Sequence, residues 1–185
     1  GSRGDLTVDD VFDQFACVTP AGVTLLSALK VEHAAGGCTC GGHATVRSLL
    51  SESLDQRADI TIVDMEAGLE HLSRSGGTLA YADVLLVIME PSRKAVLTAS
   101  RTLVLAEELG IPRVYGVGNK AVDGDREFFA ELCAEYGVDL AGVVPLDDDV
   151  AAAAKSSTSV PAGAATAVRE ELDRVIDVVG PTVTV

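Results

Sequence analysis

The sequence predicts an α/β fold in which a mostly parallel sheet carries helices on both faces. Short apolar runs rich in Val and Ile alternate along the chain with longer stretches whose apolar residues recur at helical spacing. This alternation is typical of strands joined by helical crossovers, which pack helices against the faces of a parallel sheet. We expect a single α/β domain over residues 5–185, preceded by residues 1–4, which resemble a cloning remnant.

Three strands are predicted in the first half of the chain. The first is 22–29 (GVTLLSAL), and a glycine-rich turn and a helix over 44–54 follow it. The second is 60–63, a buried run that ends at Asp64. The third, 84–89, reads VLLVIM and is the most hydrophobic of all, as expected for a central parallel strand covered on both faces.

The helix after the third strand has start and stop signals. Ser92 is predicted to cap its first turn, and Gly110 with Pro112 is predicted to end it after Leu109. A fourth strand over 114–117 follows. The second half of the chain therefore continues the alternation of strand and helix.

A fifth strand and further helices complete the predicted fold. The strand is 142–144, and the acidic run that starts at Asp147 is predicted to lie at a helix N-terminus. The helix before this strand ends at Gly137 and presents an apolar face of Phe129, Leu132, Cys133 and Tyr136. The closing helix, after Pro161, is predicted to bury Val168, Leu172, Val175, Ile176 and Val179 and to expose Arg169, Glu170, Glu171, Asp173 and Arg174.

Charge and composition exclude several classes of protein. The chain has 28 acidic and 14 basic side chains, a net charge of −14, and binding to nucleic acid or anionic membrane needs clustered Lys and Arg. No apolar stretch reaches the roughly 18 residues that span a bilayer, and no signal peptide is recognisable. We expect a cytoplasmic protein without nucleic-acid or membrane partners. Cys17 and Cys133 lie in apolar surroundings and are expected to be buried.

Cys38 and Cys40 form a candidate metal site. The two thiols are separated by one residue within a run of four glycines, so a tight turn would point both at one soft metal ion. Two ligands do not complete a tetrahedral site, so the loop would recruit His43 and another side chain or meet a second copy across a two-fold axis. The alternative is a glycine-rich connection that happens to hold two thiols.

Asp64 and Gly68 form a candidate magnesium and phosphate site. A carboxylate at the end of a buried strand, followed within four residues by glycine, is typical of proteins that hold a magnesium-bound water and sense a γ-phosphate. The glycine would let a backbone N–H approach the phosphate. The alternative is an aspartate that caps the turn after a strand.

Two segments at consecutive strand ends form a candidate base pocket. Asn119 and Lys120 come just after the predicted fourth strand, and Pro145, Leu146 and Asp147 come just after the predicted fifth. An Asn amide both donates to and accepts from a purine edge, while Pro and Leu provide an apolar wall for the ring. Their joint appearance favours a base pocket over two coincident turns.

Several segments together resemble one family. The chain is similar to the MinD/ParA-like P-loop ATPases, and specifically to the nickel-insertion accessory ATPases of carbon monoxide dehydrogenase (CooC-type). The resemblance runs from about residue 22 to the end of the chain. It rests on GCTCGGHATVRSLL, IVDMEAGLEHLSR, LLVIMEPSRKAVLTA, ELGIPRVYGVGNK and VVPLDDDV.

The resemblance implies a nucleotide-dependent nickel chaperone that dimerises with ATP or ADP and serves a metalloenzyme of the carbon monoxide dehydrogenase type. Cys38 and Cys40 would hold Ni²⁺ or Zn²⁺ between two protomers. Asp64 would be the carboxylate of the Mg²⁺ shell in a DxxxG switch that ends at Gly68. Asn119 and the 145–147 loop would surround adenine.

One element of the family pattern is not found. The family opens with a strand and a loop of the type GKGGVGKT, and no segment of this sequence fits GxxxxGK[ST]. A truncated chain, a phosphate loop on a separate chain, or a degenerate relative would each explain this, and the remnant-like first residues favour truncation. Under that reading the isolated chain is expected not to hydrolyse ATP. The alternatives to a chaperone ATPase are a non-catalytic pseudo-ATPase or metal- and partner-binding module, and a ParA/MinD-type positioning ATPase.

Overall fold

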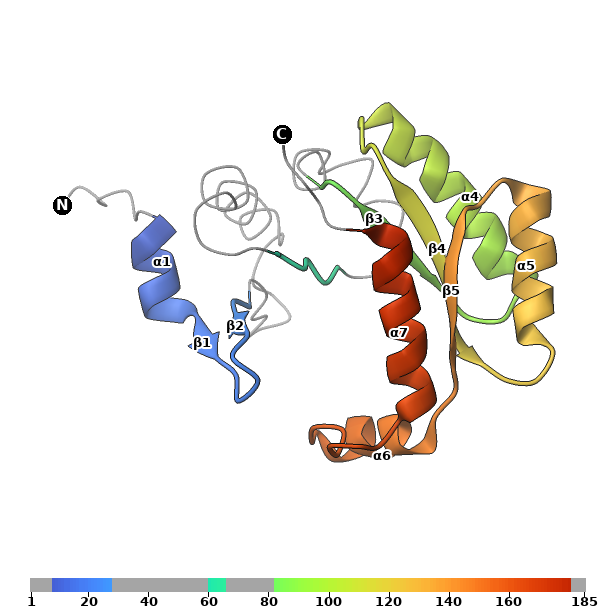
Figure 1. Cartoon of the computed structure of the whole chain (residues 1–185). Helices are drawn as coiled ribbons and strands as arrows, with labels where there is room; N and C mark the ends of the chain where they lie inside the picture. Colours follow the sequence, from blue (N-terminus) through green and yellow to red (C-terminus); the bar gives the residue numbers. More distant parts are fainter. Residues whose placement is uncertain (1–7, 28–59, 66–81, 181–185) are drawn as a thin grey trace, which may run out of the picture. The chain divides into compact units, whose positions relative to one another are not determined.

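The computed structural model describes residues 8–27, 60–65 and 82–180 (Figure 1). The chain divides into two compact units, Gly1–Tyr81 and Ala82–Val185, which are described separately. The single domain expected over 5–185 stays a prediction. No helix of the described residues is long and apolar enough to cross a membrane.

The described part of the first unit is a short helix followed by a hairpin. Helix α1 spans Val8–Phe15, and strands β1 (Cys17–Val18) and β2 (Thr24–Leu25) pair antiparallel. The turn between them begins at Thr19, which accepts the Gly22 N–H on its carbonyl at 2.9 Å. Helix α1 was not predicted from the sequence.

The two strands predicted in this unit are corrected by the structure. Of 22–29, only Thr24–Leu25 forms a strand, and it joins a hairpin instead of a parallel sheet because its backbone pairs with the nearby β1; residues 28 and 29 lie outside the described residues. Segment 60–63 is irregular, with Ile62 88% exposed. A strand forms only where a neighbour bonds to its backbone, and no described residue pairs with this segment.

The second unit contains a three-stranded parallel sheet in the order β3-β4-β5. Strand β3 spans Leu85–Met89, β4 spans Val114–Ala121 and β5 spans Leu140–Pro145. Each prediction of a strand here is confirmed, and β4 and β5 are longer than predicted. As a result, Asn119 and Lys120 lie within the last residues of β4 and not after it. The prediction that β3 is central and covered on both faces is wrong for the described residues, where β3 is an edge strand with Leu86 and Ile88 exposed.

Helices cover both faces of this sheet, as predicted (Figure 1). On one face, α4 (Arg93–Glu108) and α5 (Asp125–Tyr136) enclose a core that includes Met89, Val96 and Phe129. On the other face, α7 (Thr166–Val179) packs on β5 and buries Val117, Ala141, Val144 and Val175. A short helix, α6 (Asp148–Ser156), connects β5 to α7.

The predicted helix ends of the second unit are confirmed. The Ser92 side chain caps α4 by accepting the Ala95 N–H at 3.1 Å. Gly137 ends α5 with a left-handed φ of 69°, a conformation that glycine adopts without strain. Asp147 is the N-cap of α6, so the acidic run does lie at a helix N-terminus.

Close packing of helices on the sheet depends on glycines in the strands. A Cβ at Gly118 of β4 would lie 2.7 Å from the Phe129 ring, and one at Gly142 of β5 would lie 2.6 Å from Val175. Both distances are too short for a carbon contact. The bare backbone at these positions lets α5 and α7 approach the sheet.

Four burial predictions are wrong. Glu171 is 2% exposed, whereas Leu172 and Ile176 are 45% and 65% exposed, so α7 buries a stripe rotated from the predicted one. The reason is that α7 packs on β5 and leaves β3 uncovered on that face, where Ile88 is 58% exposed. Cys17 is exposed because it lies in the β1–β2 hairpin, while Cys133 is buried, as predicted.

Candidate functional site

The carboxyl end of β4 has an unusual backbone conformation. Lys120 has a φ of 56°, in the left-handed region that residues other than glycine rarely adopt. Its N–H donates to Oδ1 of the preceding Asn119 at 3.0 Å, and its Nζ lies 2.5 Å from Oε1 of Glu90, the residue that follows β3. The hydrogen bond from Lys120, and its charge, hold the pKa of the Glu90 carboxyl below its ordinary value.

The carboxyl end of β5 joins this region. The Leu146 N–H donates to the Ala121 carbonyl at 2.8 Å, and Ala121 lies opposite Pro145 across a register shift between the two strands. Asp147 Oδ1 accepts the N–H groups of Asp149 and Val150, both at 3.0 Å. The structure therefore brings the two predicted base-binding segments to one edge of the sheet and assigns one Asp147 oxygen to capping α6.

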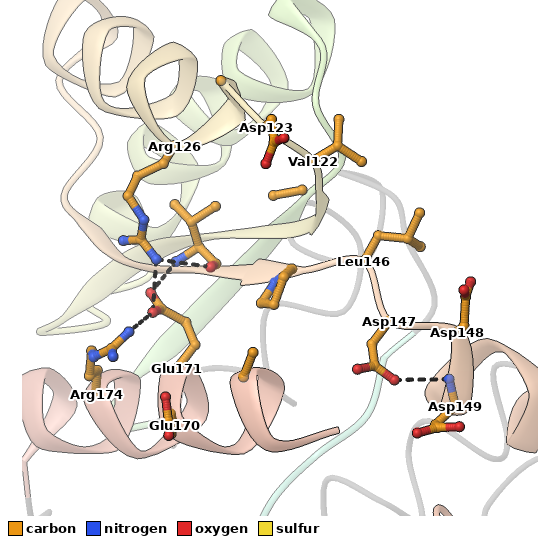
Figure 2. Close-up of a pocket in the computed structure, with 15 residues that line it drawn as sticks. Val122, Asp123, Arg126, Leu146, Asp147, Asp148, Asp149, Glu170, Glu171 and Arg174 are labelled. Atoms are coloured by element: carbon orange, nitrogen blue, oxygen red, sulfur yellow. Dashed lines mark hydrogen bonds and ion pairs between the residues drawn. The ribbon is translucent and has the colours of Figure 1, made fainter. Parts of the chain in front are cut away.

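A pocket of about 1010 Å³ opens beside these strand ends (Figure 2). Pro145, Leu146 and Asp147 line it, as do Ala121 at the end of β4 and residues 122–124 after it. Asn119 and Lys120 are not among the lining residues. In Figure 2, Arg126 of α5 and Glu171 of α7 reach toward the same stretch of β5, and Leu146 and Asp147 lie farther along, toward α6.

The charge of the pocket fits the base end of a nucleotide better than its phosphates. Six carboxylate side chains and two arginines line it, so a triphosphate would meet a net negative surface. A purine base is uncharged, and the Leu146 side chain, 52% exposed, offers an apolar surface for a ring. The pocket lining therefore fits a base better than phosphates, because both of its arginines already donate to Glu171.

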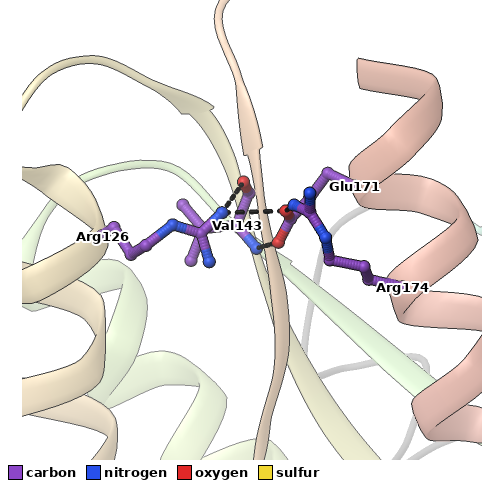
Figure 3. A network of polar contacts seen from close by, with 4 residues as sticks. All are labelled: Arg126, Val143, Glu171 and Arg174. Carbon is purple, nitrogen blue, oxygen red and sulfur yellow. Dashed lines mark hydrogen bonds and ion pairs between the residues drawn. The ribbon is translucent and has the colours of Figure 1, made fainter. Parts of the chain in front are cut away.

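A buried carboxylate forms one side of the pocket (Figure 3). Glu171 Oε1 accepts the Val143 N–H at 2.7 Å, and Oε2 accepts from Arg126 at 2.8 Å and from Arg174. Arg126 also donates to the Val143 carbonyl at 3.3 Å. Both backbone groups of Val143 on the outer edge of β5 are thus bonded to side chains, which ties α5 and α7 to that edge.

The pKa of Glu171 is set by two opposing effects. Burial raises the pKa of this carboxyl, but the hydrogen bond from Val143 and the contacts with Arg126 and Arg174 outweigh burial, so its pKa lies below its ordinary value. Glu171 is therefore ionised at neutral pH. The two arginines and the backbone N–H compensate its buried charge.

Arg126, Glu171 and Arg174 were not predicted to act as a group. One signal was available: Glu171 lies three residues after Val168 and four before Val175, so it shares their helical stripe. Its carboxylate led to the wrong prediction of a solvent-facing position. The partner Arg126 lies on a different helix, and no local pattern connects the two.

Other predicted site residues belong to the first unit. Asp64 is exposed in the irregular segment after Val63. Cys38, Cys40, His43 and Gly68 lie outside the described residues. Among the residues that the structure does describe, no group of three or more His, Cys, Asp or Glu side chains is arranged to hold a metal ion.

Comparison with known proteins identifies relatives, although no protein-family model matches the chain. It is 39% identical over 153 residues to the carbon monoxide dehydrogenase accessory protein CooC of Rhodospirillum rubrum, covering 82% of this chain and 56% of that protein. It is 34% identical over 144 residues to an uncharacterized ATP-binding protein of Methanocaldococcus jannaschii, covering 77% and 55% respectively. The chain thus spans about half the length of these relatives.

A solved structure has the same fold. The MinD cell division protein of Aquifex aeolicus matches with a TM-score of 0.69 over 94% of this chain and 72% of that chain, at 13% sequence identity. At this identity the likeness concerns the fold alone. The sequence relatives show that the chain belongs to the CooC-type ATP-binding proteins, and the structural match shows that its fold is MinD-like.

Proposed function

We propose that the chain is the nucleotide-binding part of a nickel chaperone ATPase for maturation of an enzyme of the carbon monoxide dehydrogenase type. The observation that supports the proposal is the bond from Leu146 N–H to the Ala121 carbonyl, which joins the ends of the two strands whose following segments are predicted to bind the base. The relatives named as a carbon monoxide dehydrogenase accessory protein and as an ATP-binding protein support it.

Binding of ATP·Mg²⁺, measured by calorimetry, tests the nucleotide part of the proposal. Asn119→Ala is expected to weaken binding about tenfold, the effect of losing one good hydrogen bond. Asp64→Ala is expected to weaken binding with Mg²⁺ present and to have no effect in EDTA, because Asp64 would act on the metal shell. Asp173→Ala removes an exposed carboxylate on α7 and is the control. Absence of ATP binding in a folded sample would favour a non-catalytic module.

Metal binding tests the chaperone part. Equilibrium dialysis with Ni²⁺ and with Zn²⁺ is expected to give one ion per two chains, since two Cys38–Cys40 loops would complete a four-thiolate site in a homodimer. Cys38→Ser and Cys40→Ser should each abolish it. Cys17→Ser, which removes an exposed thiol elsewhere, should leave the stoichiometry unchanged. Full binding by the double Cys38/Cys40 variant would refute the metal site.

The client enzyme and hydrolysis complete the proposal. The nickel-loaded chain is expected to activate a nickel-free carbon monoxide dehydrogenase, and the Cys38→Ser variant is not. We expect no ATP hydrolysis by residues 1–185 alone, because no segment of them fits the phosphate loop.

A further inference from the structure

Glu90 and Lys120 form an ion pair between the ends of two neighbouring strands. The parallel register pairs Met89 with Gly118, which places the residue after β3 near the last residues of β4. Glu90 Oε1 and Lys120 Nζ are 2.5 Å apart, although the side chains are 66% and 59% exposed. Exposed pairs of this kind add little to stability. The contribution of this pair therefore lies in the backbone segment that it contacts.

The ion pair holds a strained segment. Lys120 has a left-handed φ of 56°, a conformation that only glycine adopts without strain. The register between β4 and β5 also shifts between Gly118 and Ala121. Such irregularities near strand ends redirect side chains and cluster at functional sites. Here the segment is fixed by Glu90 from β3 and by the Leu146 N–H bond to Ala121 from the loop after β5.

The strained segment orients the Asn119 amide. The Lys120 N–H donates a hydrogen bond to the Asn119 side chain at 3.0 Å. The accepting atom is therefore the amide oxygen of Asn119. Both N–H groups of that amide then remain for other partners. On the edge of adenine that an Asn amide pairs with, the matching acceptor is N7.

We propose that Glu90 is a positioning residue for purine recognition: through its ion pair with Lys120 it fixes the Asn119 amide so that its N–H groups meet an acceptor such as N7 of the base. This inference rests on the proposed nucleotide-binding function. It adds the carboxyl end of a third strand, β3, to the candidate base site.

The test compares ATP with 7-deaza-ATP, in which a C–H replaces N7. Calorimetry on the full chain is expected to show about tenfold tighter binding of ATP, the effect of one hydrogen bond. In Glu90→Gln this ratio should fall below about threefold, since the contact with Lys120 loses its charge and holds the Asn119 amide less firmly, while binding of 7-deaza-ATP changes little. Lys120→Gln, which breaks the pair from the other side, should lower the ratio equally, and Glu90→Asp, which keeps the charge, should preserve most of it.

A matched control separates positioning from general surface charge. Glu135→Gln breaks another exposed pair, in which Arg93 lies 3.2 Å from Glu135 at the far end of α5, and should leave the ratio unchanged. An unchanged ratio in both Glu90→Gln and Lys120→Gln would overturn the positioning role and leave the proposed function standing. Equal binding of the two nucleotides by the wild type would overturn the Asn119 geometry, and no binding of either would remove the proposed function itself.

Discussion

Glu171 shows how one side chain connects three elements. Its carboxylate is 2% exposed and bonds to the Val143 N–H of β5, to Arg126 of α5 and to Arg174 of its own helix. Removing it would leave a backbone N–H and two cations without their common partner. Such a loss costs about 1–3 kcal/mol of stability.

The lowered pKa of Glu171 predicts how its contribution depends on pH. Its pKa in the folded state lies below the value of about 4.3 in the unfolded chain, so its stabilising effect is complete above that value and is lost as pH falls through the folded-state pKa. We expect the difference in free energy of unfolding between wild type and Glu171→Gln to be constant from about pH 7 to pH 5 and to shrink below about pH 4.

Urea denaturation over this pH range measures the difference. Glu170→Gln is the control, since this neighbouring carboxylate is exposed, and its effect on stability should be small throughout. Equal pH dependence in the two variants would contradict the role assigned to Glu171.

At the scale of elements, α6 ends on a residue that could be improved. Ser157 follows the helix with φ 52° and ψ 41°, the left-handed conformation in which glycine is the favoured residue. Its side chain is exposed, so no packing is lost on substitution. We expect Ser157→Gly to raise the free energy of unfolding by about 1 kcal/mol.

The same substitution at the adjacent serine is a control that should change stability in the opposite direction. Ser156 is the last residue of α6 and is also exposed, so Ser156→Gly should lower stability by about 0.5 kcal/mol through lost helix propensity. Thermal or urea unfolding of both variants measures the pair. Destabilisation by both would show that the left-handed position carries no strain.

At the scale of the whole molecule, the unit Ala82–Val185 has its own core on both faces of its sheet. We expect this fragment to unfold cooperatively in urea by itself. Phe129→Ala, which truncates a fully buried side chain, should then cost about 3–5 kcal/mol in the fragment and the same amount in the full chain. A gradual transition, or a much smaller cost in the fragment, would show that residues 1–81 contribute to this core.

Prediction from sequence succeeded in this unit wherever the signal was local. Ser92, Gly137 and Asp147 mark helix ends through bonds that reach only a few residues, and the VLLVIM run marks strand β3 by composition, although one face of that strand is exposed. The candidate base pocket was also predictable in part, because the carboxyl ends of parallel strands share one sheet edge. The pairing of Glu90 with Lys120 was not, since 30 positions separate them.

The sequence by itself determined the α/β class, the parallel strands and the helix ends of the second unit, because propensities and caps act between near neighbours. Only the tertiary structure decided that Glu171 is buried, that Thr24 and Leu25 form a hairpin and that segment 60–63 is exposed. The physical reason is the same in each case. Burial and strand pairing depend on which distant part of the chain a residue contacts. The local sequence of an apolar or β-branched run does not specify that partner.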